Sequence, residues 1–117
     1  MKYVLLIHSN PTLWESLPPD EANRVLGDHF AMIEELTKSG ELVGPVRGLA
    51  NERTFVEIRN GVPAVTDGPF GEAKEQLAGV FELDVEGLDR AIQIAGPLAQ
   101  HSVVEIRPLM EDAGTEM

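Results

Sequence analysis

The distribution of apolar residues along the first third of the chain predicts a strand followed by an amphipathic helix. Residues 3–7 form an unbroken apolar run, which is typical of a strand buried on both faces in the middle of a sheet. Residues 8–18 hold serine, asparagine and proline and predict a connecting loop. Residues 19–38 carry apolar side chains at the three-and-four spacing of a helix packed on a sheet, and Gly40 ends it. The apolar positions of this helix are Ala22, Val25, Leu26, Phe30, Ile33 and Leu36.

His29 lies within this apolar stripe. At about 100° per residue it falls close to Val25 and Ile33 and away from the acidic Glu34 and Glu35. We therefore expect its imidazole to point toward the sheet.

The middle of the chain predicts an edge strand and a hairpin. Residues 41–49 contain a glycine-proline pair, which suits a short strand at a sheet edge. Residues 54–59 and 62–65 predict two strands joined by Asn60 and Gly61, and both of these residues tolerate the positive φ of a tight hairpin turn.

The last part of the chain predicts a turn, a strand, a helix and a final strand. Residues 66–78 form the turn, with a single helical turn within it, and residues 79–85 alternate as a strand does. A second helix follows, and residues 103–109 form the last strand. The apolar positions of the second helix are Leu88, Ala91, Ile92, Ala95 and Leu98.

This order predicts an α+β fold of the ferredoxin-like type, β-α-β-β-α-β with an inserted β-hairpin. We expect one domain over residues 1–110 and a polar tail over residues 111–117.

The strand faces suggest how the sheet is covered. Alternation places Phe81 and Leu83 opposite Glu82, and Ile106 opposite Arg107. Two helices cover one face only, so we expect the charged face to line the interior of a dimeric α/β barrel formed by two copies of the chain. The alternative is a monomer whose second sheet face is solvated.

Composition narrows the function classes. Of 117 residues, 9 are basic and 20 are acidic, and the resulting net charge of −11 disfavours nucleic acid and anionic membranes as partners. The chain has no cysteine, and we find neither a secretory signal nor an apolar run of membrane-spanning length, so we expect a cytoplasmic protein.

Several segments together resemble a known family. They are MKYVLLIH, TDGPFGEAKEQLAGVFELDV, LDRAIQIAGPL and VVEIRPLM, and their most specific part is the motif Asp67, Gly68, Pro69 and Phe70. Over residues 1–110 the chain resembles the DGPF branch of the YCII-related proteins. The resemblance implies a ferredoxin-like dimeric α/β barrel and no settled reaction.

The resemblance also suggests a site. In the wider YCII family, a helix histidine is paired with an aspartate in a proposed active site, and His29 matches that histidine. The family's aspartate follows the second helix, whereas the candidate here is Asp67, ahead of the fourth strand of the core. We therefore assign His29 and Asp67 as catalytic candidates, with their proximity left open.

Each candidate has a structural alternative. His29 suits general acid-base catalysis because its ordinary pKa is near 6.5, yet a buried histidine bonded to a backbone carbonyl fits the same pattern. Asp67 before a glycine-proline pair is also a natural turn former.

We assign substrate binding to His8, Lys74, Arg107 and Phe70. We expect no cofactor and no metal, because the chain has no HExxH pattern, no paired cysteines, no phosphate loop and no nucleophile elbow. The leading hypothesis is a small-molecule enzyme of the lyase or isomerase type. The alternatives are a non-catalytic ligand-sensing or protein-interaction module and a structural dimer.

Overall fold

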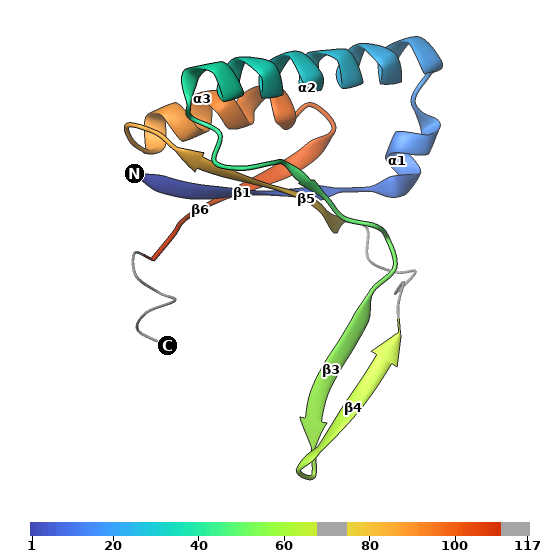
Figure 1. Cartoon of the computed structure of the whole chain (residues 1–117). Helices are drawn as coiled ribbons and strands as arrows, with labels where there is room; N and C mark the ends of the chain where they lie inside the picture. The colour runs from blue at the N-terminus through green and yellow to red at the C-terminus, as the bar shows by residue number, and fades with distance from the viewer. Residues whose placement is uncertain (68–74, 111–117) are drawn as a thin grey trace.

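A computed structural model describes residues 1–67 and 75–110 (Figure 1). Its elements are β1 (Lys2–Ser9), α1 (Pro11–Ser16), α2 (Pro19–Ser39), β2 (Arg47–Gly48), β3 (Thr54–Arg59), β4 (Val62–Asp67), β5 (Gln76–Asp84), α3 (Leu88–Leu98) and β6 (Ser102–Pro108). Within the described ranges, no helix has the length and apolar character needed to cross a membrane.

The main sheet has the strand order β2-β5-β1-β6, and all its neighbouring strands are antiparallel. The helices α2 and α3 lie on one face of this sheet (Figure 1). No helix of the described residues covers the other face, which we call the open face. The predicted α+β class is confirmed, as is the order β-α-β-β-α-β with an inserted hairpin. The sequence placed the first strand at the centre and residues 41–49 at an edge, and both predictions are confirmed.

The hydrophobic core lies between the helices and the sheet. Leu5 of β1 pairs with Phe81 of β5 and with Ile106 of β6, so three strands contribute to one layer. Leu5 and Phe81 are fully buried, and burial of each such side chain stabilises the fold by about 1.5–3 kcal/mol. The buried apolar residues are Tyr3, Leu5, Leu36, Phe81, Leu83, Val85, Ala91, Ile94 and Ala95.

The predicted loop over residues 8–18 is wrong over most of its length. β1 continues to Ser9, and a short helix, α1, follows. The Asn10 side chain accepts hydrogen bonds from the backbone nitrogens of Thr12 (3.0 Å) and Leu13 (3.4 Å), and Pro11 suits the first helical turn. The Asn-Pro pair is therefore a helix start.

Both predicted helix faces need one correction. Phe30 was expected to face the sheet but is 65% exposed, because the inward line of α2 passes through His29 and Met32 and a residue 100° from His29 falls on the flank. In α3 the buried isoleucine is Ile94, whereas the predicted Ile92 is about half exposed.

The hairpin turn is confirmed, with positive φ at Asn60 (52°) and Gly61 (77°). β4 extends two residues beyond the prediction, to Asp67, and β5 begins at Gln76 rather than at residue 79. The predicted turn and helical turn fall mainly on residues 68–74, which lie outside the described residues.

The hairpin extends from the main sheet on the side opposite the helices (Figure 1). Nearly all its residues are exposed, including Val56 and Val65, which pair across the strands. Ile58 and Pro63 pair two positions further on, so these four side chains form one exposed apolar face.

A candidate ligand-binding pocket around His29

A cavity of about 230 Å³ lies between the N-terminal half of α2 and the end of the sheet where β1 stops and β6 starts. Most of its lining is apolar, and α1 and the turn between α3 and β6 border it. The lining residues are Ile7, Ser9, Trp14, Val25, Leu26, Asp28, His29, Met32, Val46, Arg47, Gly48, Ala78, Gly79, Phe81, Pro97, Leu98, Gln100, His101 and Ser102.

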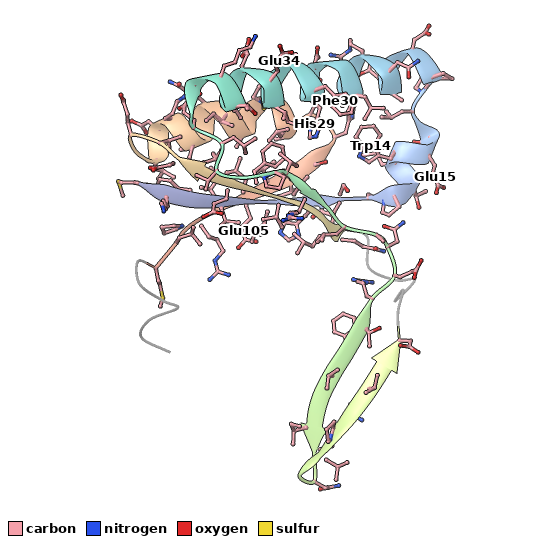
Figure 2. All side chains as sticks on the ribbon, viewed as in Figure 1. Trp14, Glu15, His29, Phe30, Glu34 and Glu105 are labelled. Atoms are coloured by element: carbon pink, nitrogen blue, oxygen red, sulfur yellow. The ribbon has the colours of Figure 1, made fainter. Side chains whose placement is uncertain are left out.

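His29 points into this cavity, so the predicted inward orientation is confirmed (Figure 2). Its imidazole lies edge-on to the ring of Phe81, with 5.6 Å between the ring centroids and 81° between the ring planes. The ring of Phe30 makes a similar edge contact from the exposed flank of α2, at 6.0 Å and 73°. Aromatic rings therefore hold the imidazole on two sides.

Burial lowers the pKa of His29 below its ordinary value, because desolvation disfavours the charged ring. The ring is therefore neutral at pH 7, with one nitrogen able to donate a hydrogen bond and the other able to accept one. Among the described residues, neither nitrogen has a hydrogen-bond or ion-pair partner. Both are therefore available to a ligand.

Asp67 lies at the end of β4, exposed, where its Oδ1 accepts a hydrogen bond from Thr54 Oγ1 at 3.4 Å. It is not among the residues that line the cavity of the same protomer. The pairing of Asp67 with His29 stays a prediction.

His8 and Arg107 lie on the open face of the sheet. Their neighbours Ile7 and Ile106 pack against the core, and alternation turns His8 and Arg107 the other way. His8 Nε2 lies 3.0 Å from Glu105 Oε1, and the exposed Arg107 has its Nε 4.0 Å from Glu105 Oε2. A single protomer thus places these two residues across the sheet from His29. The assigned Lys74 and Phe70 lie outside the described residues.

Sequence reasoning missed two cavity residues, Trp14 and His101. Trp14 was assigned to a loop, and the signal that places it is the Asn10 cap of α1. His101 was not among the predicted site residues, but it directly precedes β6, at the same sheet end as Ser9 of β1. Strand ends that meet at one edge of a sheet bring such residues together.

No group of three or more metal-ligating side chains occurs in the described part of the chain. The described lining of the cavity is mainly hydrocarbon, with Ser9, Asp28, Gln100, Ser102 and two histidines as its chief polar members. This composition suits a small organic molecule with an apolar body.

Fold and cavity together define a small α+β domain that carries a histidine-containing, largely apolar pocket on the helix side of its sheet. The model of the YCII-related domain matches residues 1–112, and the chain belongs to this family. An uncharacterized protein of Rhizobium meliloti (strain 1021) is similar to it, with 32% identity over 115 residues, covering 93% of this chain and 92% of that protein.

Proposed function

We propose that the cavity binds a small, largely apolar molecule and that His29 transfers a proton to and from it, as in enzymes of the lyase or isomerase type. The observation that carries this proposal is the neutral, partly buried imidazole that lines a cavity of about 230 Å³.

The size of the cavity sets the size of the ligand. An apolar cavity of roughly 150 Å³ in another protein binds benzene. A cavity of about 230 Å³ therefore suits a single substituted ring or an aliphatic chain of similar bulk. Val25, Met32 and Phe81 supply apolar surface for the body of such a ligand.

The neutral His29 ring suits the role of general base. A base must be unprotonated at the working pH, and burial keeps this imidazole so. We propose that it takes a proton from a carbon next to a carbonyl group, which leaves the enolate of the ligand and an imidazolium. The imidazolium then returns a proton to the same or a neighbouring carbon.

Isotope exchange tests this proposal directly. Acetophenone, a single-ring methyl ketone, is incubated with the protein in D₂O, and loss of its methyl proton signal is followed by NMR. We expect protein-dependent exchange that disappears in His29→Gln and persists in the matched variant His8→Gln, whose histidine lies on the open face. Exchange that survives in His29→Gln would refute the role of His29.

Ligand binding without turnover is the second candidate function. Among the described residues, no carboxylate lies within hydrogen-bonding distance of His29 to orient it as a base. Saturable binding of acetophenone without any exchange of its methyl protons would favour this candidate.

We also propose that two copies pair through the open sheet face to form a dimeric α/β barrel. Val4, Leu6 and Val80 lie side by side on this face, half-buried, with charged residues around them. The exposed apolar hairpin extends on the same side (Figure 1). In such a pair, the hairpin of one copy, with Asp67 at the end of β4, lies against the neighbouring copy. His8 and Arg107 line the space between the two sheets.

The assembly is tested by analytical ultracentrifugation. We expect the wild type to sediment as a dimer and Leu6→Asp to sediment as a monomer with an unchanged circular dichroism spectrum. Ile92→Asp, on the exposed flank of α3, is the control and stays dimeric. A monomeric wild type would refute the pairing.

We further propose that the chain belongs to the DGPF branch of the family, because it carries the motif Asp67, Gly68, Pro69 and Phe70.

A further inference from the structure

The cavity holds a second histidine that the proposed function does not use. His101 lies between α3 and β6, is largely buried, and lines the cavity together with His29. Its Nε2 lies 3.3 Å from Oε1 of Glu21, in the first turn of α2. The ring of Trp14 meets the His101 ring edge-on, with centroids 6.4 Å apart. Contacts from α1 and α2 thus fix this imidazole in place.

Glu21 is itself held in place. Arg24 donates to both of its carboxylate oxygens, at 2.6 and 3.3 Å, and also donates to Gln100 Oε1 at 3.0 Å. The hydrogen bond from Arg24, followed by that from His101, lowers the pKa of Glu21. The carboxylate is therefore ionised at pH 7 and can only accept hydrogen bonds.

An acceptor at Nε2 decides which nitrogen of His101 carries the proton. When its ring is neutral, His101 donates its Nε2 hydrogen to Glu21, so that Nδ1 keeps a lone pair and acts as an acceptor. A ligand that pairs with this nitrogen must offer a hydrogen, as a hydroxyl group does.

Polar residues gather at the same end of the cavity. The buried Ser9 of β1 pairs in register with Ser102 of β6, and Ser102 directly follows His101. Phe81 and Met32 line the cavity elsewhere with hydrocarbon. The cavity is therefore divided between an apolar wall and a polar end.

We propose that His101, positioned by Glu21, is the group that binds the polar end of the ligand, and that the ligand is an uncharged molecule of about one ring with a hydroxyl group, a phenol or an enol. This inference rests on the proposed function, since it takes the cavity as the ligand site. An anionic ligand is disfavoured, because Asp28 lines the cavity and Glu21 stands behind His101. Arg47 pairs with Val80, so its side chain lies on the open face of the sheet and supplies no positive charge to the cavity.

Three probes of equal ring size test the proposal: p-cresol carries a hydroxyl group, toluene lacks it, and p-toluate carries a carboxylate. Affinities are measured by protein-observed NMR. One neutral hydrogen bond corresponds to about a five- to tenfold gain in affinity, so we expect p-cresol to bind more tightly than toluene by about this factor. We expect p-toluate to bind more weakly than both.

The variant His101→Phe keeps a ring and removes the acceptor. We expect it to bind toluene as the wild type does and to lose the preference for p-cresol. The control Ile92→Phe, changed on the exposed flank of α3, keeps the preference. A preference that survives in His101→Phe would overturn the assignment.

A measurement on the wild type does not depend on how the variant folds. The ring nitrogens of His101 are observed by ¹⁵N NMR, and we expect Nδ1 to shift on addition of p-cresol and to stay unchanged with toluene. Equal binding of toluene and p-cresol, without this shift, would overturn the role of His101 and leave the apolar pocket intact. Absence of binding by either would overturn the proposed function as well.

Discussion

Phe81 and Phe30 offer a direct test of what holds the pocket together. Both rings meet His29 edge-on at similar distances, but Phe81 is 1% exposed and Phe30 is 65% exposed. Truncation of Phe81 to alanine loses a transfer free energy of about 1.5–3 kcal/mol. The void left in a close-packed core adds to this, for a total of about 3–5 kcal/mol. We expect this loss of unfolding free energy in Phe81→Ala, with a decrease in Tm of roughly 10–30 °C.

Phe30→Ala is the matched variant, because it removes an equivalent ring contact without opening the core. An edge-to-face aromatic pair contributes about 0.5–1.5 kcal/mol. At this exposed position we expect Phe30→Ala to lower the unfolding free energy by less than about 1 kcal/mol. Urea unfolding followed by circular dichroism measures both. Equal losses of unfolding free energy in the two variants would refute the conclusion that Phe81 stabilises the fold mainly through its burial and not through its ring contact with His29.

Three further predictions follow from individual residues. The pKa of His29 is lowered in the folded state, so the unfolded chain binds more protons as the pH drops below about 6.5. The free energy of unfolding therefore falls with the pH until the folded ring also protonates. Urea midpoints measured at several pH values will show a smaller fall in His29→Gln than in the wild type. Asn10→Ala removes the cap of α1 at a cost of about 1 kcal/mol, which thermal unfolding will detect as a lowered Tm, and Asn10→Asp will restore it. Gly61→Ala strains the hairpin turn at φ 77° by roughly 1 kcal/mol, and faster amide exchange in β3 and β4 than in the wild type will report it; unchanged exchange would contradict the strain.

Much of the fold could be predicted because local patterns and tertiary packing agree. The alternation around Phe81 and Leu83 identified the core face of β5, and the Asn60-Gly61 pair identified the hairpin turn. The apolar stripe of α2 correctly predicted that His29 faces the sheet, but it also included Phe30, which lies on the exposed flank of the helix. A stripe read from sequence has a width, and only packing against the sheet decides where its border falls.

The candidate site was harder to predict, because its parts come together only through the topology of the sheet. Ser9 and Trp14 lie near the start of the sequence and His101 lies near its end, and the three meet at one end of the folded sheet. His8 and Arg107 are chemically plausible site residues, but strand alternation turns them to the open face. Residue type alone therefore suggested candidates on both faces, and the fold distinguishes between them.

Both borders of the main sheet discourage the addition of a further strand. β2 offers only two paired residues, and β6 carries the charged Glu105 and Arg107 and ends at Pro108, which has no backbone hydrogen to donate. Lateral growth of the sheet into a chain of copies is thereby disfavoured. A contact through the open sheet face, in which each copy offers the same surface to the other, would close after two molecules instead of growing into a fibre.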